Sequence, residues 1–217
     1  MKKPKVLEAL GFRKEWIYEA IITTYSGAKA HSAPIGVSTS DHEKITAEIY
    51  KTSETCANIL SKRAFAVNLS SDVSLFYDSC YKKEALIYGR ADNIDAPILA
   101  QADASLEISL VSLVDLGDRI RFTGSIAGYS SRKGPGAVKL INRGDALALE
   151  ALIAATKMPH ASAEEKELLS KEIRRIHRVV SRVSPGSSAE KLVNEPSLRL
   201  LSLCSCISWL AISCIKA

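Results

Sequence analysis

The first half of the chain carries the alternating pattern of apolar and polar positions that is typical of β-strands. Residues 16–24 (WIYEAIITT) are mostly β-branched or aromatic, and residues 45–50 alternate regularly. Strands are predicted over residues 16–24, 33–37, 45–50, 65–69, 106–110 and 120–126. A turn at Gly117-Asp118 joins the last two into an antiparallel hairpin. A short helix is expected among the strands, over residues 54–62.

After residue 136 the apolar period lengthens to that of helices. The positions that indicate a first helix are Leu149, Leu152, Ile153 and Thr156. Ser162 and Glu165 have the spacing of a capping box ahead of a second helix, which Pro185-Gly186 ends. The apolar stripe of this second helix contains Leu169, Ile173, Ile176, Val180 and Val183. Because strands come first and helices follow, the predicted fold class is α+β and not a wound parallel sheet.

Most of the net positive charge of the chain lies in its N-terminal segment. The formal net charge of the chain is +5. The first fourteen residues supply five basic and one acidic side chain, a net of +4, from Lys2, Lys3, Lys5, Arg13 and Lys14 against Glu8. A nucleic-acid-binding protein usually gathers its basic residues on a folded face. We therefore expect a basic leader over residues 1–14 and no nucleic-acid partner.

The cysteines point to a reducing environment. The chain contains Cys56, Cys80, Cys204, Cys206 and Cys214. The number is odd and no two pairs have the spacing of zinc ligands, so neither a disulfide framework nor a metal site is expected. Since no long apolar run follows the basic start, no signal peptide is predicted, and the expected location is cytoplasmic.

An apolar tail lies close to the C-terminus. Residues 200–215 (LLSLCSCISWLAISCI) carry no charge. The segment is shorter than the roughly 20 apolar residues that a membrane-spanning helix needs, and it is rich in serine. A tail that packs on the protein, or a stretch translated out of frame, is favoured over a marginal membrane anchor.

The common nucleotide-binding loops, G-x-G-x-x-G and G-x-x-x-x-G-K-[ST], are absent. The first stretch with candidate chemistry is Ala30–Val37 (AHSAPIGV). Pro34 and Gly36 restrict this strand to an edge or a bulge. Its small residues would let a flat ligand approach the backbone, although a plain strand start with a bulge explains the same pattern.

The second stretch is Lys51–Asn58 (KTSETCAN), at the start of the predicted short helix. A helix N-terminus offers unpaired N–H groups and partial positive charge, which favour a phosphate. Ser53 and Thr55 have hydroxyls that can donate to phosphate oxygens, and Lys51 adds a positive charge. An ordinary N-cap by Ser53 or Thr52 is the alternative interpretation.

Two further stretches carry polar residues in notable places. Asn68 lies within the apolar strand predicted over residues 65–69, which indicates a contact to a ligand or a turn. Asn142 and Arg143 precede the first C-terminal helix. Arg143 there would either reach an anion or pair with a carboxylate on the surface.

Taken in this order, the four stretches resemble the FMN-binding split-barrel family of unknown function that occurs in methanogens and methylotrophs. The resemblance covers roughly residues 16–193 and rests on A-H-x-A-P-I-G-V, S-x-T-x-x-N, V-N-L-x-x-D and N-R-G. It implies a flavin-reductase-like split β-barrel over residues 15–136 and a small helical C-terminal domain over residues 137–195. Residues 196–217 are then an apolar tail.

The resemblance also implies FMN as the cofactor and a set of residues around it. The residues beside the isoalloxazine ring would be His31, Ser32, Ala33 and Pro34. The phosphate would be bound by Lys51, Ser53 and Thr55, with Asn58 supporting that turn. Asn68 would lie near the flavin, and Asn142 and Arg143 would complete its site. His31 is the only candidate acid or base in these stretches.

Two features depart from the family pattern. Glu54 places an acid within the phosphate segment, where a neutral residue would be easier to accept. The apolar tail does not resemble the ending of the family. Both departures keep open a third interpretation, in which the protein has lost its cofactor and is purely structural.

The expected function is that of a flavin-dependent oxidoreductase with a small-molecule electron donor or acceptor, and a non-catalytic FMN carrier or sensor is the alternative. The resemblance implies a link to pterin-dependent one-carbon metabolism. A homodimer is also expected, because Val111, Leu113 and Val114 break the alternation of their strand and make part of it apolar on both sides. The resemblance places FMN at or near the interface of such a dimer.

Overall fold

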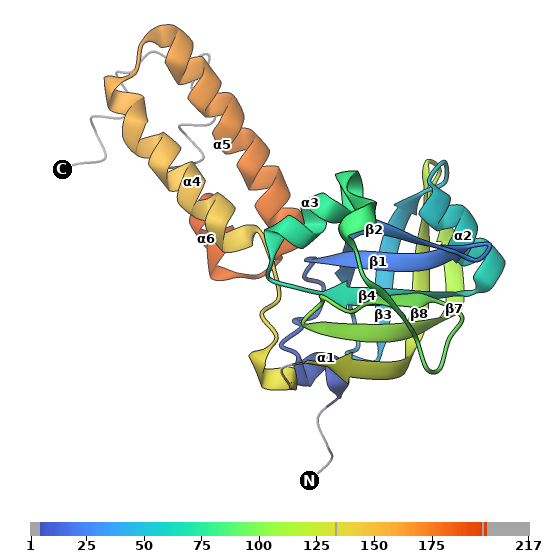
Figure 1. Ribbon diagram of the computed structural model, residues 1–217. Coiled ribbons are helices and arrows are strands. Elements are labelled where there is room, and N and C mark those ends of the chain that lie inside the picture. Colours follow the sequence, from blue (N-terminus) through green and yellow to red (C-terminus); the bar gives the residue numbers. More distant parts are fainter. Residues whose placement is uncertain (1–4, 133, 197, 199–217) are drawn as a thin grey trace. The chain divides into compact units, whose positions relative to one another are not determined.

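The computed structural model describes residues 5–132, 134–196 and 198, and the chain divides into two compact units (Figure 1). The first unit covers Met1–Ile141 and contains the strands, and the second, Asn142–Ala217, contains the last helices. Sequence analysis places this boundary after residue 136. The chain beyond that loop still belongs to the barrel, because Ile141 forms a β-bridge with Glu19.

Six strands close into a barrel in the order β1-β2-β3-β8-β7-β4, and each pairs with its neighbours in antiparallel fashion. They are β1 Tyr18–Ser26, β2 Lys29–Ser38, β3 Lys44–Tyr50, β4 Ala64–Leu69, β7 Ala104–Asp115 and β8 Arg119–Ser131. The six predicted strands are confirmed, with displaced ends. The predicted hairpin turn is present as well, and Gly117 adopts a φ of +90° there, which glycine tolerates without a steric cost.

The barrel interior accounts for the alternation along the strands. Inward-facing residues with no exposed surface include Ile22, Ile45, Phe65, Leu106 and Phe122. Because successive side chains of a strand point to opposite faces, such residues recur at every second position.

β1 is buried on its outer face as well. There Ile21 belongs to a second apolar cluster with Leu75, Leu86 and Leu99. The segment that supplies these partners comprises α3 Val73–Tyr81, a 3-10 turn Lys83–Ala85, β5 Tyr88–Arg90 and β6 Pro97–Leu99. None of its elements is predicted from the sequence. Burial of both faces of β1 fits its nearly continuous apolar run.

The N-terminal segment is part of the first unit. From residue 5 onwards it forms α1, Val6–Ala9, and a turn. Leu7, Leu10 and Phe12 are almost fully buried in the barrel core. The segment expected as a basic leader therefore contributes three apolar side chains to the core.

In its described residues the second unit contains three α-helices, α4 Gly144–Lys157, α5 Ala163–Val183 and α6 Ser188–Val193. The predicted capping box is present at the start of α5, since the Ser162 hydroxyl accepts from the Glu165 N–H and the Glu165 carboxylate accepts from the Ser162 N–H. The predicted stripe of α5 is confirmed by four buried residues, Ile173, Ile176, Val180 and Val183. Within the described part of the chain, no helix has both the length and the apolar character needed to cross a membrane.

The helix α4 is confirmed, but the apolar positions that reveal it are not the ones it buries. Its buried side chains are Ala148, Ala151 and Ala154. The larger residues Leu149, Leu152 and Ile153 are 57%, 42% and 38% exposed. Small side chains let two helix backbones approach closely, which explains why the alanine face of α4 packs against α5 and α6.

Candidate functional site

Four residues of the first unit meet at the N-terminus of α2, Glu54–Lys62. His31 on β2 places its Nε2 3.1 Å from the Thr55 hydroxyl. Its Nδ1 lies 3.1 Å from a Glu54 carboxylate oxygen and 3.4 Å from the Lys83 ammonium. The imidazole therefore joins three elements that are far apart in sequence, and we call these four residues the His31 cluster.

The two partners of His31 Nδ1 require different tautomers of the neutral imidazole, because Lys83 can only donate to this nitrogen and the Glu54 carboxylate can only accept from it. If Nδ1 accepts from Lys83, the proton lies on Nε2 and is donated to the Thr55 oxygen, so the Thr55 hydroxyl proton is free for another acceptor. If a neutral ring donates from Nδ1 to Glu54, Nε2 accepts the Thr55 proton instead. The tautomer of His31 thus decides whether Thr55 can donate to a ligand.

The imidazole is held in its neutral form. Its side chain is only 12% exposed. Burial lowers the pKa of His31 below its ordinary value near 6.5, the positive charge of Lys83 lowers it further, and the carboxylate of Glu54 partly opposes both effects. At neutral pH the ring consequently offers one donor and one acceptor.

The polar contacts continue from the His31 cluster into the end of the barrel. Thr55 and Asn58 are both buried on the side of α2 that faces the strands. The Asn58 amide donates to the hydroxyl of Thr24 on β1 over 3.0 Å. Thr24 is the cross-strand partner of His31, so the four side chains occupy adjoining positions. Asn58 therefore anchors α2 to β1 of the barrel.

Ser53 acts as an N-cap residue, which is the alternative to phosphate binding, and Lys51 is held in an ion pair. The Ser53 hydroxyl accepts from the Cys56 N–H and donates to the Tyr50 carbonyl, as an ordinary N-cap residue does. Lys51 forms an ion pair with Asp115 at the end of β7, with 2.7 Å between nitrogen and oxygen. Of the three predicted phosphate ligands, the structure joins only Thr55 to His31 by a contact.

The residues after His31 on β2 alternate between two faces. Ser32 is buried, where its hydroxyl donates to the Ser79 carbonyl of α3 and accepts from the Tyr88 hydroxyl. Ala33 is half-buried and Pro34 is exposed. Ser32 thus fastens α3 and β5 to the barrel, while the small side chain of Ala33 lies on the same face of β2 as His31 and Pro34 lies on the face of Ser32.

Asn68 has a structural role. It is fully buried on β4, and its amide nitrogen donates to the Ile21 carbonyl and the Thr23 hydroxyl, each over 2.9 Å. Its oxygen accepts from the Leu99 N–H and the Ser105 hydroxyl, each over 2.8 Å. These four bonds use the full capacity of the amide, which ties β4 to β1, β6 and β7.

Asn142 and Arg143 begin the second unit. The Asn142 amide donates to the Val183 carbonyl at the end of α5 over 2.7 Å, and its oxygen accepts from the Gly144 N–H over 2.8 Å. Arg143 is the N-cap residue of α4. The pair thus connects the start of α4 to the end of α5 within the second unit.

The His31 cluster has the donors that an anion requires. The Thr55 hydroxyl, the Lys83 ammonium and an imidazole N–H lie together at a helix end, where the first N–H groups have no intrahelical partner. Glu54 opposes an anion, although its side chain is 54% exposed and so partly hydrated. Lys83 is the member that sequence analysis missed, because it belongs to the segment after β4 that shows no clear period.

The fold defines a class of protein, a split β-barrel followed by a helical unit. The chain belongs to the family of proteins of unknown function called DUF447, whose N-terminal domain matches residues 18–132. The matched residues run from the first strand of the barrel to the residue after its last strand.

Several solved structures share the fold. An FMN-bound protein of the same family from Methanosarcina mazei is similar over 90% of this chain and 99% of its own, with a TM-score of 0.53 and 22% identity. A flavoredoxin from Methanosarcina acetivorans matches 59% of this chain and 77% of its own, with a TM-score of 0.50 and 15% identity. An FMN-binding protein from Thermus thermophilus with bound 1-cyclohex-2-enone matches 60% and 85%, with a TM-score of 0.50 and 18% identity.

Proposed function

We propose that this chain is an FMN-binding flavoprotein whose phosphate site lies at the N-terminus of α2. The observation that carries the proposal is the His31 cluster, in which a hydroxyl, an ammonium and an imidazole converge on a helix end. The similar proteins from Methanosarcina mazei and Thermus thermophilus are described as FMN-bound and FMN-binding. The small side chain of Ala33, on the same face of β2 as His31, suits the approach of a flat ring.

The ligand proposed is FMN and not FAD. The His31 cluster recognises a terminal phosphate, which carries close to two negative charges at neutral pH. A pyrophosphate is usually bound by a glycine-rich loop, and the sequence contains neither common form of it.

Titration of the apoprotein with FMN and FAD, followed by flavin fluorescence, tests this proposal. Thr55→Val keeps the shape of the side chain but removes the hydroxyl. We expect FMN binding about 5- to 100-fold weaker, the range for hydrogen bonds to a charged group. The control is Thr46→Val on β3, where the hydroxyl contacts only Thr123 among the partners seen. Tighter binding of FAD, or unchanged binding of FMN by Thr55→Val, would contradict the proposal.

We further propose that the protein is a flavin-dependent oxidoreductase acting on small molecules. Bound FMN supplies electron or hydride transfer, while the protein supplies orientation and electrostatics. His31 is the residue on the face of Ala33 that can accept a proton at neutral pH, because burial and Lys83 lower its pKa and keep it neutral. A link to one-carbon metabolism would require a reduced pterin to act as donor.

The alternative is an FMN carrier or sensor without turnover, and reduction of the holoprotein distinguishes the two. NADH, NADPH and a tetrahydropterin are offered in turn, with a dye as electron acceptor. Repeated turnover with any donor supports the oxidoreductase, and turnover with the tetrahydropterin supports the one-carbon link. An FMN-loaded protein that no donor reduces would be a carrier or sensor.

A homodimer is proposed from the distal part of β7 and β8. Val111, Leu113 and Val114 are 50%, 41% and 51% exposed, an unusual concentration of large apolar side chains on one hairpin. This surface adjoins the start of α2, because Asp115 on the hairpin pairs with Lys51. A two-fold dimer formed through the hairpin would place the FMN site near its interface.

Sedimentation of wild type and Val111→Lys tests the dimer. We expect the charge to lower the dimer fraction and the FMN occupancy together, because an unpaired ammonium in an apolar interface is costly. Ala127→Lys, at an exposed position of β8, is the matched control. A wild type that sediments as a monomer with full FMN would rule the dimer out.

A cytoplasmic location is proposed from the cysteines. Cys56 is buried and Cys80 exposed, and neither forms a disulfide. Thiols of this kind persist in a reducing compartment. Cell fractionation with an antibody against the chain tests the location, and recovery in a secreted fraction would contradict it.

A further inference from the structure

One face of α5 carries basic side chains that the proposed flavin site does not use. Arg175, Arg178 and Arg182 follow one another at spacings of three and four residues, so they share one side of the helix, and we call them the arginine face. All three are exposed, on the side of α5 opposite to its buried apolar stripe. A row of exposed basic residues along one helix is a usual feature of surfaces that bind polyanions.

The charge of the arginine face is not compensated within the described part of the chain. There, none of its three guanidinium groups forms a hydrogen bond, an ion pair or a ring contact. Residues 173–189 contain four arginines and no aspartate or glutamate. The positive charge is therefore available to a ligand.

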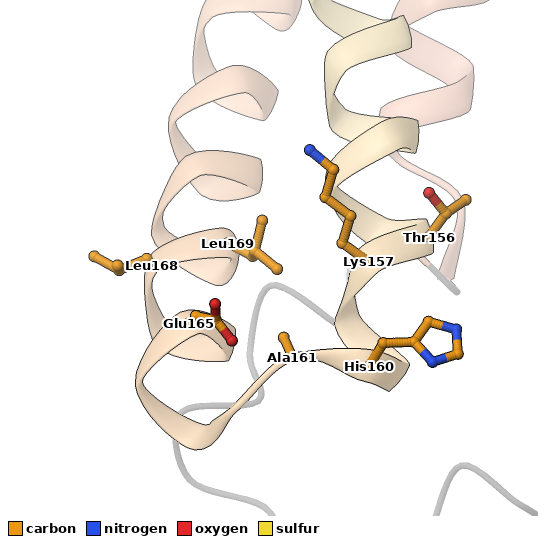
Figure 2. Close-up of a pocket in the computed structure, with 7 residues that line it drawn as sticks. All are labelled: Thr156, Lys157, His160, Ala161, Glu165, Leu168 and Leu169. Carbon is orange, nitrogen blue, oxygen red and sulfur yellow. The ribbon is translucent and has the colours of Figure 1, made fainter.

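The acidic residues of α5 lie towards its other end. The helix contains six basic and four acidic side chains, a net of +2, and none of the acids lies beyond Glu172. Figure 2 shows the start of α5, where Glu165 lines a pocket of about 450 Å³. Because the two halves of the helix nearly cancel, counting charge along the sequence conceals the arginine face. The expectation of no nucleic-acid partner rests on that count.

The helix dipole does not explain the arginine face. The partial negative charge at the C-terminus of a helix favours basic side chains, but the effect falls off within about the last turn. α5 ends at Val183, so the dipole accounts for Arg182. Arg175 and Arg178 lie more than one turn from this end. Their charge is not needed to stabilise the helix end.

We propose that the arginine face binds the phosphate backbone of a nucleic acid without reading its sequence. From Arg175 to Arg182 the helix rises about 10 Å, a length over which duplex DNA carries about six phosphates. Three guanidinium groups at this spacing can each reach a phosphate. The planar guanidinium binds a phosphate through two parallel hydrogen bonds, which a lysine cannot do.

An acidic protein is the other class of partner whose charge would suit this surface. Protein interfaces are usually centred on buried apolar and aromatic side chains. Over the described residues 171–196, no large apolar side chain is exposed. Nucleic-acid interfaces are more polar and much more positively charged. The composition of the surface around the arginine face therefore favours a nucleic acid.

Fluorescence anisotropy of a labelled DNA duplex of about 20 base pairs, and of one of its strands, tests the proposal in the full chain. The logarithm of the binding constant should fall linearly with that of the salt concentration, with a slope of about −2 to −3 for three phosphate contacts. Binding of either form supports the proposal, and the tighter one identifies the source of the phosphates. Arg178→Gln should reduce the slope by about 1.

A triple variant with Arg175→Gln, Arg178→Gln and Arg182→Gln should bind at least about tenfold more weakly at low salt. The matched control removes the same charge from exposed positions of the first unit, by Lys14→Gln, Lys29→Gln and Lys44→Gln together. It should lose much less affinity, because these charges lie outside the proposed contact. Equal losses in the two triple variants, or no binding of either DNA at low salt, would overturn the proposal.

Two further measurements complete the test. Glutamine keeps the helix propensity of arginine, and circular dichroism confirms that each variant folds. If the triple variant does not fold, the slope of Arg178→Gln decides, and a slope equal to that of the wild type would overturn the proposal. So would tighter binding of a labelled polyglutamate than of DNA of equal charge, which would indicate an acidic protein as the partner.

Discussion

His31 has two kinds of neighbour, a hydroxyl on one ring nitrogen and charged groups of opposite sign near the other. The tautomer of the imidazole therefore decides whether the Thr55 hydroxyl can donate its proton to a ligand. A phosphate that accepts from Thr55 would favour the state in which Nε2 carries a proton. In that state both ring nitrogens are engaged, so His31 would act on the phosphate through Thr55.

The lowered pKa of His31 predicts a specific pH dependence of stability. Between the folded pKa and the unfolded value near 6.5, the unfolded chain binds more protons, so the free energy of unfolding falls as pH falls through this window. Above it the effect is absent. His31→Gln should therefore lose less stability than wild type between pH 8 and pH 5 in urea denaturation without flavin. Equal losses in both proteins would show that His31 does not titrate in this way.

Asn68 illustrates the other use of a polar side chain, which is to connect strands. Asn68→Leu would leave the Leu99 N–H, the Ser105 hydroxyl and the Ile21 carbonyl without their present partner inside the barrel. We expect a loss of about 2–5 kcal/mol, because each buried unpaired group costs about 1–3 kcal/mol. Urea denaturation measures this loss, and a change below about 1 kcal/mol, as expected for Thr46→Val, would contradict the structural role.

At the scale of elements, the start of α2 combines favourable and unfavourable charge for an anion. The helix end and Lys83 attract a phosphate, and the Glu54 carboxylate repels it. Glu54→Gln should strengthen FMN binding about 2- to 10-fold, the scale of one like charge a few ångströms away in a hydrated site. Glu43→Gln, an acid paired with Lys5 elsewhere on the barrel, is the control. Weaker binding by Glu54→Gln would mean that the carboxylate supports the site.

The helix pair of the second unit depends on the apolar stripe of α5. Ile176 has no exposed surface and packs with Ala148 and Ala151 of α4. Ile176→Ala should cost about 2–5 kcal/mol, the usual range for such a truncation in a core. Calorimetry of the whole chain measures the melting of this unit, with the exposed Glu172→Ala as control. An unchanged transition would show that the α4–α5 contact does not stabilise the unit.

The elements that sequence analysis predicts are those with a long or regular apolar period. The barrel strands, α2, α4 and α5 fall in this group, and the capping box at Ser162 fixes the start of α5. β5 and β6 have three residues each, too few to show a period. For α4 the period reveals the helix but not its buried face, because alanines pack more closely than the leucines beside them.

The residues of the candidate site that lie on regular elements are also the ones that the sequence predicts. The stretch around Thr55 stands out because hydroxyls precede a helix, and the motif of His31 lies on a regular strand. Lys83 and Asp115 reach the site from elements far along the chain, and only the closed barrel brings them there. Sequence spacing therefore identifies the helix end as a phosphate candidate, but not which of its side chains are free to bind.

At the scale of the whole molecule, the chain joins a barrel that carries the proposed flavin site to a helical unit with its own apolar core. The barrel core and the His31 cluster lie within the first unit, and the matched family domain spans the same strands. The proposed cofactor site can thus be tested in the full chain by measurements that read the flavin alone.

Calorimetric titration with FMN and with riboflavin, which lacks the phosphate, tests the central claim most directly. We predict that wild type binds FMN at least about tenfold more tightly than riboflavin, a difference of about 1.4 kcal/mol or more. In Thr55→Val the preference should shrink, while the affinity for riboflavin stays the same. Equal affinity of the wild type for the two flavins would contradict a phosphate site at the start of α2.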